Sequence, residues 1–274
     1  MKNVIQIGDH SFYHINRVGK GAPVVFLHGF TGSGSTWRTI APLIPCETFM
    51  PDLAGHGRTK AVCTDLETEA ESIKRAMNDR GFFSFHVVGY SMGGRLALAM
   101  GLMYPEAVRS LVLESASPGL ETEAEREERR KADEELASKI ENKGIEWFVD
   151  FWENIPMFET QKWLPESIRE SVRRERQNQT ETGLASSLRG MGTGAQKSYW
   201  NRIHELTMPV LLITGSLDHK FTNIARLMKK RIPNCQWMKI DGAGHAIHVE
   251  QHEKFGTIVK TFLLEIKGGN LDGF

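Results

Sequence analysis

A serine flanked by glycines, between a predicted strand and a predicted helix, constrains the fold of this chain more than any other feature. The run Gly89-Tyr90-Ser91-Met92-Gly93-Gly94 matches the pattern G-x-S-x-G. Residues 86–88 before it predict a buried strand, and residues 95–103 after it predict a helix that ends before Pro105. A chance Gly-Ser turn would match the letters but would not need this strand and helix. The pattern therefore predicts a serine hydroxyl exposed in a sharp turn at the carboxyl edge of a sheet.

Further apolar runs predict the other strands of that sheet. They cover residues 23–27, 49–52, 110–114, 208–214 and 235–240. Predicted helices at residues 37–43, 64–78 and 251–266 lie between or after them. Residues 4–8 and 11–18 predict an antiparallel hairpin around the turn Gly8-Asp9-His10. This alternation predicts an α/β fold with a mostly parallel sheet flanked by helices.

The alternation stops between residue 119 and about residue 203. Here the sequence becomes helical, with many charged side chains in residues 121–142 and aromatic side chains in residues 144–158. We expect this segment to form a helical cap over the sheet edge. The predicted organisation is a core in two parts, residues 1–118 and 206–274, with the cap at residues 119–205 inserted between them.

The composition argues against several classes of protein. The formal net charge is zero, so we expect no basic surface that attracts nucleic acid or an anionic membrane. No apolar run is long enough to span a bilayer, and residues 1–20 lack the pattern of a signal peptide. Cys46, Cys63 and Cys235 have no C-x-x-C spacing, which predicts reduced thiols rather than disulfides or a zinc site. We expect a cytoplasmic monomer that holds no metal ion.

Asp218 and His245 follow two of the later predicted strands. With Ser91 they give the chain order Ser, Asp, His that is expected on such a fold. An imidazole titrates near neutral pH and can take the proton that a serine hydroxyl does not lose alone. A buried carboxylate holds that imidazole in one tautomer. The sequence therefore predicts a catalytic triad of Ser91, Asp218 and His245.

Other residues compete for two of these roles. His248 and His252 are alternatives to His245, but both fall toward the following predicted helix. Asp241 is an alternative to Asp218, but it lies too close in sequence to His245 to support it from a separate strand end.

Two backbone N–H groups are candidates for an oxyanion hole. The loop that begins His28-Gly29-Phe30 follows an interior strand and opens at the same sheet edge as Ser91. We expect the N–H groups of Phe30 and Met92 to face a developing oxyanion. The alternative for this loop is a plain glycine-rich turn. For His56, in the loop after the next strand, we expect a structural or pocket-lining role.

Several longer motifs occur together in this chain. They are HGFTGS at residues 28–33, GYSMGGR at 89–95, LESASPGL at 113–120, FWENIP at 151–156 and GMGTG at 190–194. With them the chain resembles the α/β-hydrolase superfamily over essentially its whole length. The motifs in the predicted cap make the match more specific, since together the set is similar to the 2-succinyl-6-hydroxy-2,4-cyclohexadiene-1-carboxylate synthases of menaquinone biosynthesis.

This resemblance implies a lyase on a hydrolase scaffold. The family eliminates pyruvate from 2-succinyl-5-enolpyruvyl-6-hydroxy-3-cyclohexene-1-carboxylate and uses no metal or organic cofactor. Its triad would act as a base relay, in which Ser91, activated by His245, removes a carbon-bound proton. The N–H groups of Phe30 and Met92 would hold the enolate oxygen. The implied partner is a small polycarboxylate substrate.

The resemblance also implies which residues bind that substrate. Arginine binds carboxylates through paired hydrogen bonds, and Arg95 lies one helical turn after Ser91 on the same face. The positions of the family motif carry over to Arg95, Arg129, Arg176, Tyr90 and Trp152.

Each arginine assignment has an alternative. Arg95 could form a structural ion pair, and Arg129 could be a surface residue paired with Glu125. The alternatives to Arg176 are Arg169, Arg173 and Arg174.

Two further features of the cap have ordinary explanations. We expect Trp147 and Phe148 to pack the cap onto the core. The glycines of residues 190–194 do not form a phosphate loop, because no buried strand precedes them and no lysine follows within the motif.

Two other functions stay open at this point. A serine carboxylesterase or C–C bond hydrolase with a small acyl substrate would use the same triad, but a hydrolase of neutral esters has little use for Arg95. A non-catalytic receptor for a small ligand would need neither an intact triad nor two oxyanion donors.

Overall fold

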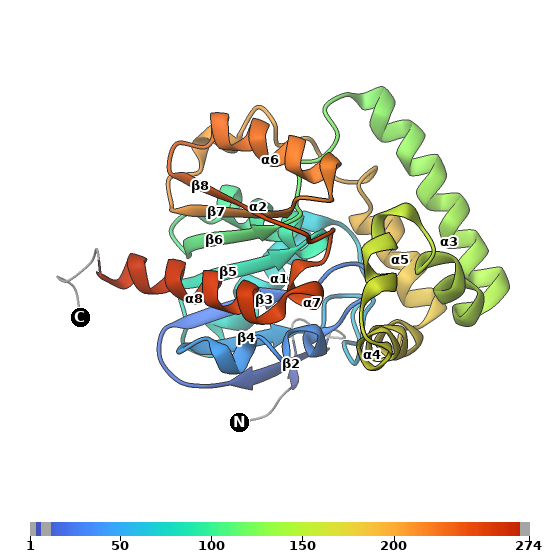
Figure 1. Ribbon diagram of the computed structural model, residues 1–274, viewed down its shortest axis with the longest axis horizontal. Helices are drawn as coiled ribbons and strands as arrows, with labels where there is room; N and C mark the ends of the chain where they lie inside the picture. The colour runs from blue at the N-terminus through green and yellow to red at the C-terminus, as the bar shows by residue number, and fades with distance from the viewer. Residues whose placement is uncertain (1–3, 7–11, 269–274) are drawn as a thin grey trace.

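Strands of the predicted sheet lie side by side in the computed structural model, which describes residues 4–6 and 12–268 (Figure 1). Within these residues the sheet has eight strands. Their order in space is β1 (Val4–Gln6), β2 (Phe12–Val18), β4 (Glu47–Pro51), β3 (Pro23–Leu27), β5 (Phe85–Tyr90), β6 (Val108–Glu114), β7 (Val210–Gly215) and β8 (Cys235–Ile240). Strand β2 is antiparallel to both of its neighbours, and all other neighbouring pairs are parallel. The predicted α/β fold is confirmed, whereas the turn at residues 8–10 lies outside the described residues.

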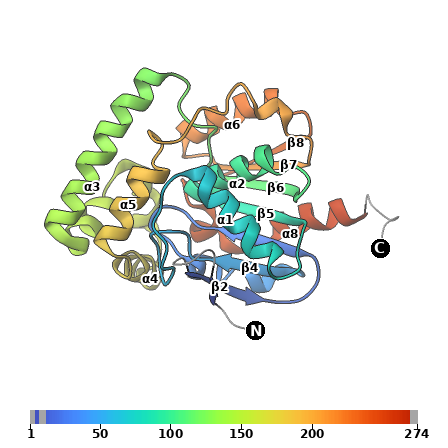
Figure 2. The same ribbon diagram turned by 180° about the vertical axis from the view of Figure 1, so that it is seen from behind.

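Helices cover both faces of the sheet, as Figures 1 and 2 show from opposite sides. On one face, buried residues of the sheet pack against α1 (Leu66–Asn78), α2 (Met92–Met103) and α6 (His219–Arg231). On the other face they pack against residues around η1 (Gly34–Trp37) and η2 (Ala41–Leu43) and against α7 (Ile247–Glu250) and α8 (His252–Gly268). Every residue of β3 is buried, as expected for a strand covered on both faces.

The helix predicted at residues 37–43 is present only in part, as two short 3₁₀ segments with a turn between them. Ser33 caps the first segment through a reciprocal pair of hydrogen bonds with Thr36, so that segment begins earlier than expected. Pro42 has no N–H to donate within an α-helix and lies in the second segment.

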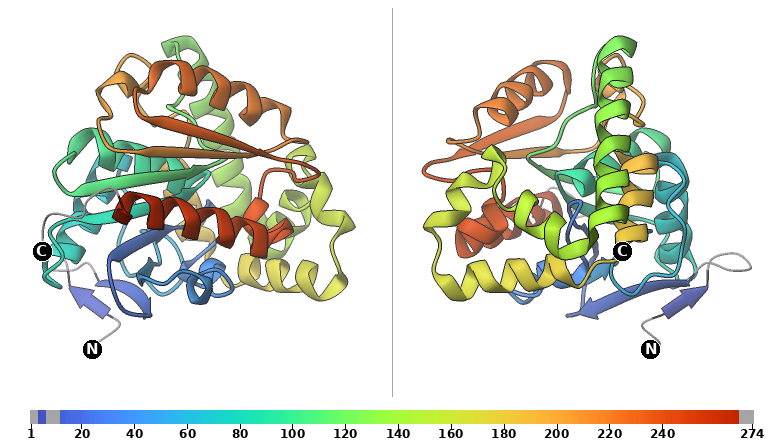
Figure 3. Two further views of the ribbon diagram at one scale, coloured as in Figure 1. Left: turned by 60° about the vertical axis from the view of Figure 1, so that its left-hand side comes forward. Right: turned by 90° about the vertical axis from the view of Figure 1, so that its right-hand side faces the viewer.

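A group of helices between β6 and β7 lies at one end of the sheet (Figures 1 and 3). It contains α3 (Glu123–Trp152), η3 (Pro156–Trp163), α4 (Glu166–Gln177) and α5 (Glu181–Met191), and η4 (Ile203–Glu205) follows it. Helix α3 is interrupted at Gly144, whose φ of 85° is in the left-handed region. Buried residues of α3 and α5 form a small core that packs against Phe30 of the loop after β3.

No helix in the described part of the chain has both the length and the apolar character needed to cross a membrane.

Candidate active site

Ser91 lies in the tight turn between β5 and α2. Its φ of 50° is unusual for a residue with a side chain and marks local backbone strain of about 1–3 kcal/mol. Added side-chain atoms at two flanking glycines would overlap backbone: Cβ on Gly89 would overlap the Gly93 carbonyl, and Cβ on Gly93 would overlap the Leu27 carbonyl. The Ser91 N–H donates to the Glu114 carbonyl of β6 over 2.9 Å, which fixes the turn against the sheet.

The structure brings together the three residues of the predicted triad. His245 Nε2 lies 3.1 Å from Ser91 Oγ, and His245 Nδ1 lies 2.6 Å from Asp218 Oδ2. His245 is almost fully buried, and Asp218 follows β7 directly. A neutral imidazole that donates from Nδ1 to Asp218 presents an unprotonated Nε2 to the serine hydroxyl. This arrangement can take a proton from Ser91.

The alternative residues for the triad lie elsewhere. His248 is buried in a pair with Glu114, whose two carboxylate oxygens are each 2.9 Å from His248 Nδ1. Asp241 accepts a hydrogen bond from the exposed Ser216 hydroxyl, and His252 is the first residue of α8.

The Phe30 N–H has a fixed direction because the carbonyl of the same peptide is held twice. The Gly29 carbonyl oxygen accepts from the Gly32 N–H over 3.0 Å and lies 2.8 Å from His28 Nδ1. His28 Nε2 accepts from the Leu53 N–H, so the proton of the neutral ring is on Nδ1. Burial lowers the pKa of His28 well below its ordinary value, which keeps the ring neutral. In a trans peptide the Phe30 N–H then points away from the Gly29 carbonyl.

The second candidate donor, the Met92 N–H, is in the first turn of α2. The first N–H groups of an α-helix have no acceptor within the helix, and they carry the positive end of its dipole. Phe30 and Met92 both line the cavity that contains Ser91.

His56 supports the loop after β3 rather than facing the cavities. Its Nε2 lies 3.0 Å from the Phe30 carbonyl oxygen and its Nδ1 lies 3.0 Å from the Ala54 carbonyl oxygen. Its ring also packs against those of His28 and Phe30. Burial lowers the pKa of His56, and the neutral ring donates to one of the two carbonyls at a time.

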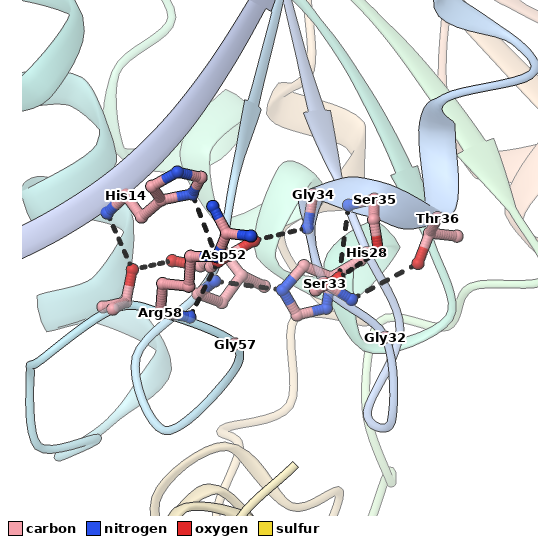
Figure 4. A network of polar contacts seen from close by, with 12 residues as sticks. His14, His28, Gly32, Ser33, Gly34, Ser35, Thr36, Asp52, Gly57 and Arg58 are labelled. Atoms are coloured by element: carbon pink, nitrogen blue, oxygen red, sulfur yellow. Dashed lines mark hydrogen bonds and ion pairs between the residues drawn. The ribbon is translucent and has the colours of Figure 1, made fainter. Parts of the chain in front are cut away.

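Asp52 ties the loop after β3 to the loop after β4 (Figure 4). Its Oδ1 accepts from the Gly34 N–H over 2.7 Å, and its Oδ2 accepts from the Arg58 N–H over 2.8 Å. The Asp52 carbonyl accepts from the Thr59 hydroxyl over 2.6 Å. These contacts hold the beginning of η1 in place, and with it the segment that carries Phe30.

Two cavities, of about 140 and 80 Å³, share the lining residues Phe30, Ser91, Trp152 and Met157. Cavity A, the larger one, is lined in addition by Arg95, Arg129 and Lys220. Cavity B is lined in addition by Tyr90, Gln161, Arg176 and His245. The predicted substrate-binding side chains therefore surround the triad serine in two groups.

Arg95 is a buried cation of cavity A. Its Nη1 donates to Gln196 Oε1 and its Nη2 to the Met191 carbonyl, each over 2.7 Å. It forms no ion pair with any carboxylate among the described residues, so the alternative of a structural ion pair is wrong. Burial lowers the pKa of its guanidinium to about 10.

Arg176 is the buried cation of cavity B. Its Nη2 donates to Gln161 Oε1 over 3.0 Å, its Nε has no partner, and its guanidinium lies over the Phe158 ring. It too forms no ion pair within the described residues, and burial lowers its pKa. Of the other candidates, Arg173 binds Asp150 and Glu153, while Arg169 and Arg174 are exposed.

Arg129 is partly exposed and lines cavity A. Its Nε donates to the buried Asp133 Oδ1 over 2.7 Å, one turn later on α3. The alternative pairing with Glu125 is wrong, because Glu125 caps the start of α3 through Thr122.

Tyr90 and Trp152 bring aromatic surface to the site. The Tyr90 ring packs on His248 and His245, with centroids 4.5 and 5.4 Å away, and burial raises the pKa of its phenol. Trp152 packs on Phe30 and on the buried Phe148, each 5.4 Å away. Phe148 thus packs the helical group onto the loop after β3, as predicted.

Trp147 and the glycines of residues 190–194 serve packing within the helical group. Trp147 stacks on Phe151 and lines neither cavity. Cβ on Gly194 would lie 2.5 Å from the Arg130 backbone nitrogen, so this glycine permits a close approach to α3.

Sequence reasoning missed several residues around the site. Gln161 holds Arg176, and Lys220 lines cavity A two residues after Asp218. Glu250 joins the triad loop to η3, since it accepts from the Gly244 N–H over 2.6 Å and from the Thr160 hydroxyl over 2.9 Å. Only the position of Lys220, two residues after the predicted triad aspartate and at the start of α6, could have been noticed in the sequence.

Among the described residues there is no group of three or more His, Cys, Asp or Glu side chains that could hold a metal ion.

Comparison with known proteins gives consistent matches. The family model described as alpha/beta hydrolase fold matches residues 22–251. The chain is 42% identical over 272 residues to the putative 2-succinyl-6-hydroxy-2,4-cyclohexadiene-1-carboxylate synthase of Bacillus subtilis (strain 168), which covers 96% of this chain and 98% of that protein.

Solved structures match over a similar length. MenH from S. aureus has a TM-score of 0.89 and 34% identity, covering 94% of this chain and 99% of that chain. A thermophilic esterase from Thermogutta terrifontis has a TM-score of 0.81 and 21% identity, covering 96% of this chain and 97% of that chain. At that identity the esterase shares the fold alone.

Proposed function

We propose that this chain, which belongs to the α/β-hydrolase family, is a lyase that eliminates pyruvate from 2-succinyl-5-enolpyruvyl-6-hydroxy-3-cyclohexene-1-carboxylate. The product is 2-succinyl-6-hydroxy-2,4-cyclohexadiene-1-carboxylate. This compound is part of the name of the relative that is 42% identical over nearly the whole chain. That relative and the 34% identical MenH structure confirm the resemblance to the synthases of menaquinone biosynthesis.

Two buried guanidinium groups without carboxylate partners carry this proposal. Arg95 lines cavity A and Arg176 lines cavity B, and Ser91 lines both. A charge removed from water is costly unless an opposite charge compensates it, and neither arginine forms an ion pair among the described residues. Asp133 near Arg95, and Glu153 and Glu175 near Arg176, act on these charges only from a longer range. A substrate with several carboxylates supplies direct partners through strong hydrogen bonds. A neutral ester would leave both arginines without an ion-pair partner.

The reaction begins with removal of a proton from carbon. His245 Nε2, 3.1 Å from Ser91 Oγ, takes the hydroxyl proton, and Ser91 takes the proton next to the succinyl carbonyl of the substrate. Asp218 stabilises the imidazolium that forms. The N–H groups of Phe30 and Met92 donate to the carbonyl oxygen as it becomes an enolate, and each such donor can contribute about 10²–10³ in rate.

Loss of the leaving group completes the elimination. As the enolate carbonyl forms again, its electron pair makes a ring double bond between C2 and C3. The existing C3–C4 double bond shifts to C4–C5, and the C–O bond from C5 to the enolpyruvyl group breaks. The enolpyruvate that leaves takes up a proton on carbon and becomes pyruvate. The triad serine forms no covalent bond to the substrate in this scheme, so it serves as a base relay.

The helical group supports this chemistry as a cap. We assign the cap to residues 119–205, inserted into a core of residues 1–118 and 206–274. It contributes Arg129, Trp152 and Arg176 to the cavities, and exclusion of water by the cap favours elimination over hydrolysis.

The three cysteines favour a reducing compartment. Cys63 and Cys235 are buried free thiols, so we propose that the enzyme works in the cytoplasm. We also propose that it is a monomer.

A comparison of two reactions tests the proposed substrate class. Arg176→Ala should lower kcat/KM for pyruvate release by about 30-fold or more, because a charge-assisted contact is lost. Hydrolysis of a small neutral ester should change less than about threefold, since such an ester makes no contact of this kind. Arg174→Ala, at an exposed position on the same helix, is the matched control and should affect neither reaction. Equal losses in both reactions would favour a carboxylesterase or C–C bond hydrolase instead.

A further inference from the structure

Glu175 lies directly before Arg176 on α4 and reaches the loop after β3. Its Oε1 lies 2.8 Å from each of the hydroxyl oxygens of Ser33, Ser35 and Thr36. The Ser33 N–H also donates to this oxygen, over 3.2 Å. One carboxylate oxygen of the helical group therefore meets four donors of the core.

Gln179, two residues after the end of α4, holds the same loop. Its Nε2 donates to the Gly32 carbonyl over 3.1 Å, and its Oε1 accepts from the Gly57 N–H over 3.0 Å. The Gly32 carbonyl and the Ser33 N–H belong to one peptide group. Glu175, in the last turn of α4, and Gln179, just after the helix, thus hold that peptide at both of its polar atoms.

The peptide group between Gly32 and Ser33 lies at the end of the turn that fixes the direction of the Phe30 N–H. The Gly32 N–H donates to the Gly29 carbonyl over 3.0 Å, so displacement of Gly32 would turn the peptide between Gly29 and Phe30. On the other side, Asp52 holds Gly34 through the contact drawn in Figure 4. The core therefore fixes the loop at Gly34, while Gln179 fixes it at Gly32 and Glu175 of α4 fixes it at Ser33.

We infer that Glu175 and Gln179 are positioning residues that couple carboxylate binding at Arg176 to alignment of the Phe30 N–H. Arg176 lies between them in the sequence, and it faces cavity B beside the triad. A carboxylate bound by Arg176 favours the docked position of α4, and the docked helix holds the Gly32–Ser33 peptide. The oxyanion donor is then best aligned when a carboxylate substrate is bound. This inference rests on the proposed function and adds a means by which the enzyme selects anionic substrates.

Two measurements on Glu175→Ala test the coupling. The first is kcat and KM for pyruvate release, and the second is the rate at which a neutral phosphonate labels Ser91, which also needs the oxyanion donors. We expect kcat and the labelling rate to fall together by about 10- to 100-fold, within the range for loss of one oxyanion donor. KM should not rise, because Arg176 is retained. Glu175 itself lines cavity B beside Arg176, and loss of its negative charge favours binding of a carboxylate there. Glu170→Ala, at an exposed position on the same helix, should match the wild type in both.

Two further variants allow the same test if Glu175→Ala does not fold. Glu175→Gln retains an acceptor oxygen and should recover most of the labelling rate, whereas Gln179→Ala should slow labelling as Glu175→Ala does. Wild-type labelling in folded Glu175→Ala, or a rise in KM alone, would overturn the inference. Absence of pyruvate release by the wild type would instead overturn the proposed function, and the labelling comparison would still decide the role of Glu175.

Discussion

Gly93 of α2 passes so close to the end of β3 that a methyl group on its Cα would overlap the carbonyl oxygen of Leu27. This approach lets the helix after Ser91 pack onto the neighbouring strand, and the atoms in the way are backbone atoms that cannot rotate aside. We expect Gly93→Ala to lower the free energy of unfolding by about 3 kcal/mol or more, measured by urea denaturation.

Gly101→Ala is the matched control for this prediction. Gly101 lies in the same helix, but Cβ there would meet the ends of the Leu111 and Leu206 side chains, which can move. The gain of about 1 kcal/mol in helix propensity also offsets part of the cost. Equal destabilisation by the two substitutions would contradict the importance of the Gly93–Leu27 approach.

Because Arg129 and Asp133 form an ion pair, we expect a substitution of Asp133 to recover part of the stability that is lost when Arg129 is removed. Arg129→Ala leaves the buried Asp133 carboxylate without its 2.7 Å partner, and should lower the free energy of unfolding by about 1–2 kcal/mol. Adding Asp133→Asn removes the charge and should restore most of this loss. Lys131→Ala removes an exposed ion pair to Glu127 and should leave the unfolding midpoint unchanged. A double variant that is less stable than Arg129→Ala would show that the charge of Asp133 is compensated by other groups.

Because of the buried Glu69 carboxyl, we expect the free energy of unfolding to fall as the pH rises. Burial raises the pKa of its carboxyl to about 7 from an ordinary value of 4.5, although Tyr13 and the Ala54 N–H donate hydrogen bonds to it. The folded state therefore holds a proton that the unfolded state has lost above pH 4.5. The free energy of unfolding should fall between pH 4.5 and 7, by up to about 3 kcal/mol from this group.

Glu69→Gln should flatten that pH dependence, because the amide does not titrate. The measurement is urea denaturation at several pH values for the wild type, Glu69→Gln and Glu71→Gln. Glu71 is exposed on the same helix and should leave the wild-type slope unchanged. An unchanged slope in Glu69→Gln would mean that Glu69 is already ionised in the folded protein.

The positions of Ser91, Asp218 and His245 could be predicted because each follows a predicted strand. The strands before Ser91 and Asp218 are buried apolar runs, and His245 follows the edge strand β8. Carboxyl ends of parallel strands meet at one edge of a sheet, so the runs alone place the three side chains together. The two 3₁₀ segments near Pro42 show the limit of that approach. Residues 37–43 favour one continuous helix, but the cap at Ser33 starts the first segment earlier and Pro42 lies in a separate second segment.

Residue patterns alone do not separate Arg176 from the other three arginines of this segment, and only the family resemblance favours it. Which face of α4 meets the core depends on contacts with Ser33, Ser35 and Thr36, about 140 positions away in the chain. The alternative pairing of Arg129 with Glu125 is wrong for a related reason. Both i, i−4 and i, i+4 carboxylates were available, and the capping of α3 by Glu125 decided between them.

The central claim is that the triad drives loss of pyruvate from a polycarboxylate, and the direct test is pyruvate release from 2-succinyl-5-enolpyruvyl-6-hydroxy-3-cyclohexene-1-carboxylate. We expect the wild type to release pyruvate far faster than the spontaneous reaction. Ser91→Ala should lose about 10³-fold or more of that rate, as expected when a triad member is removed. Pyruvate release by the wild type at no more than the spontaneous rate would contradict the account.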